Sequence, residues 1–223
     1  MTADEKEPVL NVAAVDDHPV ILRGLHAYLA EHAHDITLCG VYPSVSAMLE
    51  DTLTVSVVLL DLLLPGERDV ATNVRRIRAT GAQVVIYTSD SRPGIVREAL
   101  DAGALGLVLK SDQEERVVDA IRDAAQGKKS YSSRLAHAIV TDPRALVRLT
   151  AREREVLTLV AKGMPRRLIA KRLGISERTL PTYLERAGEK YTKASTTPAG
   201  PGELAALALE DGYIELPPDR PGQ

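Results

Sequence analysis

Short hydrophobic runs rich in β-branched residues recur through the first half of the chain, and stretches with helical periodicity separate them. Such runs are typical of buried strands in a parallel sheet. We expect strands at residues 12–15, 36–41, 57–60, 84–87 and 107–109. We expect helices at about 19–32, 44–53, from the turn at 65–66 to 79, 94–102, and after 111. Five strand–helix units in series predict an α/β fold with a five-stranded, doubly wound parallel sheet.

The second half has only helical periodicity, and the boundaries of its helices are marked by capping and glycine signals. Thr150 and Glu153 have the spacing of a capping box, as do Ser111 and Glu114 before the last helix of the first half. Two short helices joined by the sequence 174–176 have the spacing of a helix-turn-helix. The predicted organisation is an α/β domain at 9–128, a linker at 129–148 with one short helix near 135–140, a small all-α domain at 149–214, and a disordered tail at 215–223.

Four of the predicted strands end in a polar residue suited to phosphoryl chemistry. Asp16 and Asp17 follow the first strand, Asp61 the third, Thr88 the fourth and Lys110 the fifth. Because ligands bind beyond the carboxyl ends of the strands in an open α/β sheet, these side chains should meet at one edge. Carboxylates, a hydroxyl and an ammonium together predict a site for Mg²⁺ and a phosphoryl group.

Composition and charge indicate which classes of binding partner to expect. The net charge is −3, but residues 149–198 hold eleven Lys and Arg against five Asp and Glu, so the predicted helical domain is basic. A basic domain beside an acidic one indicates different partners, with nucleic acid for the basic one. The single cysteine, Cys39, excludes an internal disulfide and fits a reducing cytoplasm. No apolar run approaches the roughly 20 residues of a membrane helix, so no membrane partner is expected.

The residues also resemble a known family. The sequences 16–19, 60–66, 88–89 and 102–110 are similar to those of the flavodoxin-like receiver domain of two-component response regulators. The sequences 149–157 and 169–176 resemble the LuxR-type helix-turn-helix. The two in this order resemble the NarL/FixJ class of transcription regulators, and the resemblance extends from about residue 9 to residue 214.

The resemblance implies a role for each residue of the phosphoryl site. Asp61 is the expected phosphoacceptor, with a partner sensor histidine kinase as donor. Mg²⁺ is expected on Asp16, Asp17, Asp61 and the backbone carbonyl of Leu63. Lys110 would neutralise charge on the phosphoryl oxygens, and Thr88 would hydrogen-bond the aspartyl phosphate and transmit the change. The resemblance further implies that the phosphorylated form is a homodimer that binds promoter DNA.

The helix-turn-helix resemblance implies a DNA-binding surface on its two helices. Such modules place the second helix in the major groove. Candidate phosphate contacts before it are Arg166, Arg167, Lys171 and Arg172; candidates on it are Arg178, Thr179, Thr182, Tyr183 and Arg186. Among these we expect Arg178, Thr182 and Arg186 to contact DNA, while Leu180 and Leu184 face the domain's own core. Pro181 would interrupt a helix capped by Ser176, so the helix is predicted to begin later.

Two departures from the receiver pattern bear on the function. Leu107 stands where the family usually has Tyr or Phe, whose ring turns inward on activation, and Asp69 stands where the loop usually has a glycine. Leu107 leaves open an orphan regulator of the same fold that a ligand or partner controls without phosphorylation. An aspartate-based phosphohydrolase would use the same residue types, but its nucleophile is expected on the first strand, with a second Asp two residues later. Here Asp16 and Asp17 are adjacent.

Overall fold

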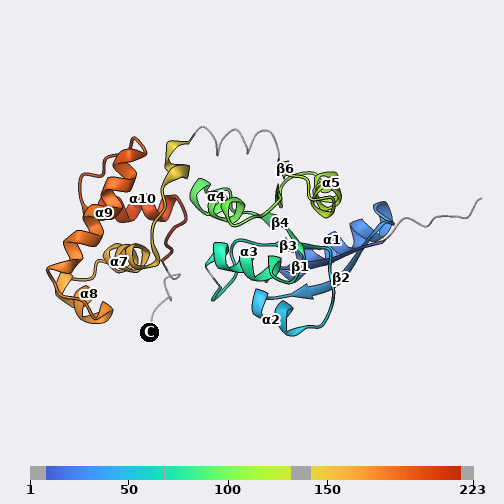
Figure 1. Ribbon diagram of the computed structural model, residues 1–223, viewed down its shortest axis with the longest axis horizontal. Coiled ribbons are helices and arrows are strands. Elements are labelled where there is room, and N and C mark those ends of the chain that lie inside the picture. The colour runs from blue at the N-terminus through green and yellow to red at the C-terminus, as the bar shows by residue number, and fades with distance from the viewer. Residues whose placement is uncertain (1–8, 68, 132–141, 217–223) are drawn as a thin grey trace, which may run out of the picture. The chain divides into compact units, whose positions relative to one another are not determined.

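The computed structural model describes residues 9–67, 69–131 and 142–216 (Figure 1). The described residues form two compact units, one of residues 9–67, 69–91 and 98–131, and the other of residues 92–97 and 142–216. The short helix expected near 135–140 and residues 217–223 of the predicted tail lie outside the described part. No helix in the described ranges is long and apolar enough to cross a membrane.

The first unit is a parallel sheet with helices on both faces. Its strands are β1 (Leu10–Val15), β2 (Ile36–Tyr42), β3 (Val57–Leu60), β4 (Gln83–Thr88), β5 (Gly106–Leu109) and β6 (Ser130–Tyr131). Its helices are α1 (Pro19–His32), α2 (Val45–Glu50), α3 (Val70–Arg78) and α5 (Glu114–Ala125), together with residues 98–101 of α4 (Pro93–Asp101). The strand order β2-β1-β3-β4-β5-β6 confirms the doubly wound α/β fold predicted from the sequence.

The sixth strand corrects the prediction of five. Ser130 and Tyr131 pair in parallel register with Gly106 and Leu107 of β5, and the Ser130 N–H donates to the Leu105 carbonyl at 2.9 Å. The segment lies at the start of the predicted linker. A two-residue strand is too short to show period-2 alternation, so the hydrophobic pattern cannot reveal it.

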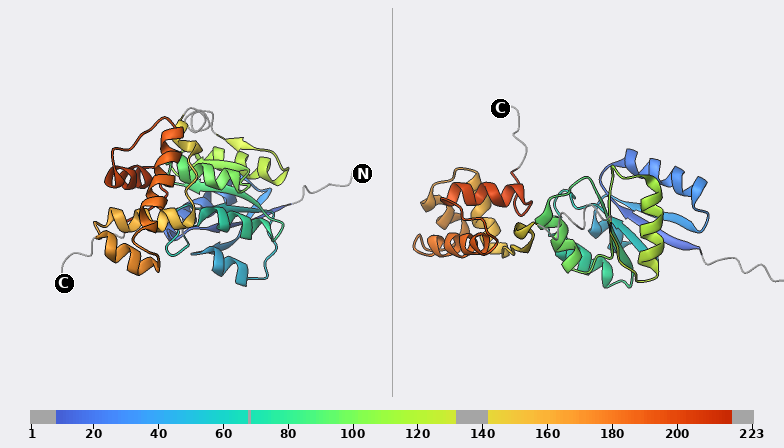
Figure 2. Two further views of the ribbon diagram at one scale, coloured as in Figure 1. Left: turned by 60° about the vertical axis from the view of Figure 1, so that its left-hand side comes forward. Right: turned by 90° about the horizontal axis from the view of Figure 1, so that it is seen from above.

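The core of this unit follows from the apolar strands. Successive strand residues face opposite sides of the sheet, so continuous apolar runs need cover on both sides. On one side, α1 and α5 pack with buried side chains such as Leu25 and Ile121 onto Val12, Leu59 and Val108. Helices lie on the other side as well, as the right-hand view of Figure 2 shows.

Helix boundaries depend on local hydrogen bonds, and one of the two predicted capping boxes is wrong. Helix α5 begins at Glu114 after the N-cap Gln113, without a side-chain cap, so Ser111 and Glu114 do not hold the first and fourth positions of a capping box. The other box is confirmed. The Thr150 hydroxyl accepts from the Glu153 N–H, and the Glu153 carboxylate accepts from the Thr150 N–H at 2.6 Å.

The second unit is all-helical among its described residues, as predicted. It contains the 3₁₀ helix η1 (Pro143–Leu146) and the helices α7 (Ala151–Ala161), α8 (Arg166–Leu173), α9 (Thr179–Lys193) and α10 (Pro201–Glu210). Its core is aliphatic apart from Tyr191 and Tyr213, in keeping with a chain that has no Phe or Trp. Gly174 ends α8 with φ +64°, a conformation that glycine adopts without strain.

Candidate functional site: an acidic phosphoryl site and a basic helix-turn-helix

The polar residues predicted at four strand ends do meet at one edge of the sheet. Strands β1, β3, β4 and β5 are neighbours, and the backbone ladder continues to their ends. The Asp61 N–H donates to the Val15 carbonyl at 3.0 Å, and the Lys110 N–H donates to the Thr88 carbonyl at 2.8 Å. The continuous parallel sheet therefore fixes the relative positions of these side chains.

Asp61 is buried, with 4% of its surface exposed, and both carboxylate oxygens have donors. The fully buried Thr88 hydroxyl donates to Oδ1 at 2.7 Å, and the Leu63 N–H donates to the same oxygen at 3.3 Å. The Lys110 ammonium donates to Oδ2 at 2.6 Å. Thr88 and Lys110 are thus the hydroxyl and the cation that were predicted from the sequence to lie beside Asp61.

Lys110 joins two carboxylates. Its Nζ lies 2.7 Å from Asp16 Oδ2 as well as 2.6 Å from Asp61 Oδ2, and its side chain is 5% exposed. Burial lowers the pKa of Lys110, but hydrogen bonds to both carboxylates and their negative charge outweigh burial and raise it above its ordinary value. The ammonium is therefore charged at neutral pH and available to neutralise an incoming anion.

The acidic cluster fits the Mg²⁺ ion that the receiver resemblance implies. Asp16, Asp17, His18 and Asp61 each offer one ligand atom, and these atoms lie within 4.8 Å of one another. Asp17 Oδ1 is buried and accepts no hydrogen bond from the described residues. Such an oxygen is costly unless water or a cation satisfies it. Carboxylate oxygens are the ligands that Mg²⁺ prefers. Ligation by the Leu63 carbonyl stays a prediction.

Two residues of this region were not predicted as part of the site. His18 directly follows Asp16 and Asp17 in the sequence, and its ring nitrogen Nδ1 lies beside their carboxylates. Glu67 lies in the loop after Asp61 and accepts from the Val45 N–H at 2.6 Å and the Ser46 N–H at 2.9 Å. Although burial raises the pKa of Glu67, hydrogen bonds from Ser46 and from both amides hold it below its ordinary value. Glu67 thereby anchors the loop after Asp61 to α2.

Asp69, in place of the usual loop glycine, does not strain this loop. Its φ is −82°, outside the left-handed region, and its carboxylate caps α3 by accepting from the Thr72 N–H at 2.8 Å. Leu107, in place of the usual aromatic, is 2% exposed and pairs in register with Tyr131 of β6.

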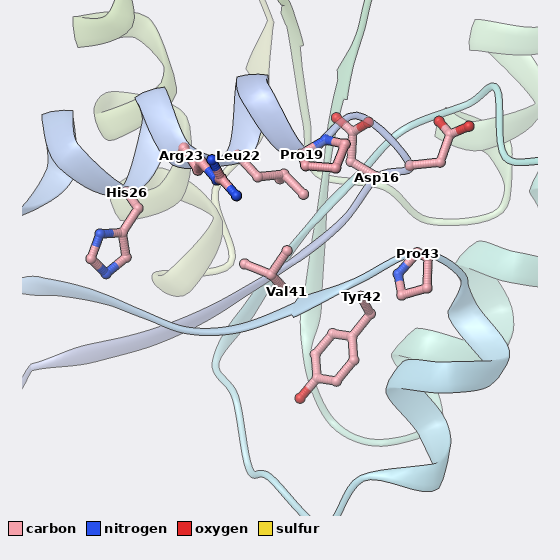
Figure 3. A pocket seen from close by; sticks show the side chains of 9 residues that line it. Asp16, Pro19, Leu22, Arg23, His26, Val41, Tyr42 and Pro43 are labelled. Carbon is pink, nitrogen blue, oxygen red and sulfur yellow. The ribbon is translucent and has the colours of Figure 1, made fainter.

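A pocket of about 460 Å³ opens beside the acidic cluster, between α1 and β2. Asp16 and Asp17 lie at one end, and apolar side chains line most of it. Figure 3 shows Leu22 and Arg23 on α1 opposite Val41 on β2. The carboxylates can therefore be approached along a concave and largely apolar surface.

In the second unit, most of the predicted DNA contacts are exposed side chains at or on α8 and α9. Exposed residues on α8 are Arg166, Arg167, Lys171 and Arg172; exposed at or on α9 are Arg178, Thr182 and Arg186. The last three recur at four-residue spacing and so share one helix face. Thr179 and Tyr183 are only partly exposed, and Tyr183 packs against the core. Leu180 and Leu184 are buried, as expected.

Helix α9 begins at Thr179, three residues after Ser176, so the predicted late start is confirmed. Ser176 Oγ accepts from the Thr179 N–H at 3.2 Å and stabilises the turn before the helix. Pro181 is the third helical residue. The N–H groups of the first turn have no partner within the helix, so proline removes nothing that the helix needs there.

Two side chains of α7 hold the helix-turn-helix together. Buried Glu153 accepts from the Lys190 ammonium of α9 at 2.6 Å, in addition to its capping bond. Arg152 donates to the Leu173 carbonyl at the end of α8 at 2.5 Å. The exposed basic face is therefore carried by two helices that are both anchored to α7.

Each of the two units of the chain matches a known protein family. Residues 12–122 match the family model of the response regulator receiver domain, and residues 147–197 match that of the bacterial regulatory proteins of the luxR family. The nitrate/nitrite response regulator protein NarL of Escherichia coli (strain K12) is 30% identical over 205 residues, which are 87% of this chain and 94% of NarL. The chain belongs to the NarL/FixJ class of two-component response regulators. It is a DNA-binding transcription regulator of that class.

Other relatives of this response regulator match along nearly its whole length. The transcriptional activator protein ExaE of Pseudomonas putida is 32% identical over 218 residues, covering 93% of this chain and 99% of ExaE. RcsB of Salmonella enterica serovar Typhimurium, solved bound to promoter P1flhDC in the presence of the phosphomimetic BeF₃⁻, aligns with a TM-score of 0.63 at 25% identity. That alignment covers 90% of this chain and 98% of the RcsB chain.

Proposed function

We propose that this response regulator is switched by Mg²⁺-dependent phosphorylation of Asp61, with a sensor histidine kinase as the phosphodonor. The observation that carries the proposal is the setting of Asp61. One of its oxygens is held by the Thr88 hydroxyl and the other by the Lys110 ammonium, and two further carboxylates lie beside it. This arrangement supports a nucleophile, a metal site and a fixed positive charge in one place.

In the proposed reaction, a carboxylate oxygen of Asp61 attacks the phosphorus of a phosphohistidine. The new O–P bond forms as the P–N bond breaks. The electron pair of the P–N bond returns to the ring nitrogen of the donor histidine. Lys110 stabilises the negative charge on the phosphoryl oxygens, and the Thr88 hydroxyl turns from Asp61 to the phosphoryl group as donor. Asp16, Asp17 and Asp61 would hold Mg²⁺, which would further neutralise that charge.

The output we propose is a homodimer that binds promoter DNA in the cytoplasm through α8 and α9. The exposed basic side chains of α8 supply phosphate contacts, and Arg178, Thr182 and Arg186 lie on one face for the major groove. Related structures support this output. One of them contains two RcsB dimers bound to two parallel DNAs, and it aligns at 25% identity with a TM-score of 0.59 over 90% of this chain and 98% of that chain.

The test is incubation with phosphoramidate, with and without Mg²⁺, followed by intact-protein mass spectrometry and size-exclusion chromatography. We expect one added phosphoryl group, dependent on Mg²⁺, and a shift from monomer to dimer. Asp61→Asn should show neither effect. Asp119→Asn, which changes an exposed carboxylate on α5, should behave as the wild type.

Buried Leu107 favours a second candidate, an orphan regulator of the same fold, because leucine cannot report a movement of Thr88 as an aromatic ring does. Absence of phosphorylation, or phosphorylation with no change in dimerisation or DNA affinity, would favour the orphan regulator. Sustained phosphate release from phosphate esters would favour the phosphohydrolase alternative instead.

A further inference from the structure

The imidazole of His18 lies inside the acidic cluster rather than beside it. Its Nδ1 is hydrogen-bonded to Asp16 Oδ1 at 3.0 Å and lies 2.9 Å from Asp17 Oδ1 and 4.0 Å from Asp61 Oδ2. The side chain is 56% exposed, so the rest of the ring faces solvent while Nδ1 faces the carboxylates. One nitrogen ligand atom is therefore placed among three carboxylates.

The backbone holds His18 in this position. Its N–H donates to Asp16 Oδ1 at 2.9 Å, and it directly precedes Pro19, the first residue of α1. A residue before proline is largely confined to extended conformations, and His18 has φ −108° and ψ 89°. The ring makes no side-chain cap to the helix. Its contacts with the cluster are thus not a by-product of helix capping.

The distances around Nδ1 match those between ligands of one metal ion. Mg²⁺ and divalent ions of similar size bind their ligands at about 2.1 Å. Adjacent ligand atoms of an octahedral site therefore lie about 3.0 Å apart, and opposite ones about 4.2 Å apart. Nδ1 lies 3.0 and 2.9 Å from the oxygens of Asp16 and Asp17, and 4.0 Å from that of Asp61. Buried Asp17 Oδ1 accepts no hydrogen bond from the described residues, although Nδ1 is 2.9 Å away.

We propose that His18 Nδ1 is an additional metal-ligating atom of the phosphoryl site and that it shifts the metal preference of the site from Mg²⁺ toward divalent transition-metal ions. This inference rests on the proposed function, since it concerns the same metal site. Mg²⁺ favours oxygen ligands, whereas imidazole suits transition metals such as Co²⁺, Ni²⁺ and Zn²⁺. A site of three carboxylates and one imidazole therefore favours these ions more than a site of carboxylates alone.

The test compares Co²⁺ with Mg²⁺ by isothermal titration calorimetry on the full chain. In His18→Asn, the ratio of Co²⁺ affinity to Mg²⁺ affinity should fall by about tenfold or more. Even mutation of a group that only hydrogen-bonds a metal ligand changes metal affinity about 10–100-fold. The matched control is His34→Asn, which changes an exposed histidine at the turn after α1, outside the cluster. Asp17→Asn should weaken both ions and so locate the binding at this site.

A spectroscopic readout complements the affinities. Pulsed electron paramagnetic resonance of bound Mn²⁺ should show coupling to a directly bound ¹⁴N nucleus in the wild type and in His34→Asn, and none in His18→Asn. An unchanged affinity ratio, or no ¹⁴N coupling in the wild type, would overturn the role of His18 while leaving Mg²⁺-dependent phosphorylation intact. If the wild type binds neither ion and Asp61 is not phosphorylated, the proposed function itself fails.

Discussion

At the scale of single residues, Lys110 compensates the charge of two buried carboxylates, so its removal should destabilise the receiver unit. Lys110→Met leaves Asp16 and Asp61 buried without their cation. Breaking a buried ion pair in this way costs about 3–5 kcal/mol. Urea denaturation in metal-free buffer should show this loss. Adding Asp61→Asn to the same chain should recover part of it. Lys128→Met, at an exposed position, should leave the midpoint unchanged.

In the helical unit, removal of the buried charge of Asp211 should stabilise the fold, whereas removal of Lys110 destabilises the first unit. It is 1% exposed at the end of α10, with Oδ1 3.4 Å from Arg144 of η1. Burial raises its pKa above the ordinary value of 3.8, more than the charge of Arg144 lowers it. The folded chain therefore binds this proton more tightly than the unfolded chain, and stability falls as pH rises from about 3.8 through the raised pKa.

Asp211→Asn keeps the size of the side chain and removes its charge. We expect a higher free energy of unfolding than the wild type at neutral pH, and a difference that disappears below pH 3.8. Urea denaturation at a series of pH values measures it, with Asp119→Asn as an exposed control. A variant less stable than the wild type at neutral pH would show instead that the ion pair with Arg144 outweighs burial.

At the scale of elements, the start of α9 decides the effect of its proline. Because Pro181 lies in the first turn, Pro181→Ala should change the free energy of unfolding by less than about 0.5 kcal/mol. Glu185→Pro, in the exposed interior of the same helix, should cost about 3 kcal/mol or more. Circular dichroism with urea separates the two. Strong stabilisation by Pro181→Ala would mean that α9 begins closer to Ser176.

The elements also show what the sequence could predict. The four strand ends were predictable because apolar runs define buried parallel strands, and parallel pairing brings their ends together without further information. The late start of α9 followed from the chemistry of proline alone. The Ser111 capping box failed because α5 begins at Glu114, so that Ser111 lies two residues before the N-cap Gln113, and motif spacing alone does not fix where a helix starts.

Contacts between distant segments were not predictable in the same way. Strand β6 exists through its pairing with β5, and Glu67 acts by binding amides of α2, 22 and 21 residues earlier in the chain. Neither has a local periodicity. His18 was adjacent to the predicted ligands, but the position of its ring depends on the backbone before Pro19 and on the carboxylates that β1 and β3 bring together.

At the scale of the whole molecule, the acidic cluster around Asp61 and a basic helical surface lie in separate units of a chain whose net charge is only −3. The average charge therefore says little about DNA binding, and the local excess in residues 149–198 decides it. The affinity for promoter DNA should fall steeply with salt, since each phosphate contact releases a counterion.

Arg178 tests this surface directly. Arg178→Ala removes an exposed guanidinium at the start of α9 and should cost about 1–3 kcal/mol of binding to promoter DNA. If Arg178 contacts a phosphate, the loss is uniform across sequences and the salt slope falls by about one unit; if it reads a base edge, the loss is confined to the promoter. Fluorescence anisotropy at several salt concentrations distinguishes these outcomes. Arg116→Ala, on α5, should bind as the wild type does, and salt-insensitive binding would place the DNA contact elsewhere.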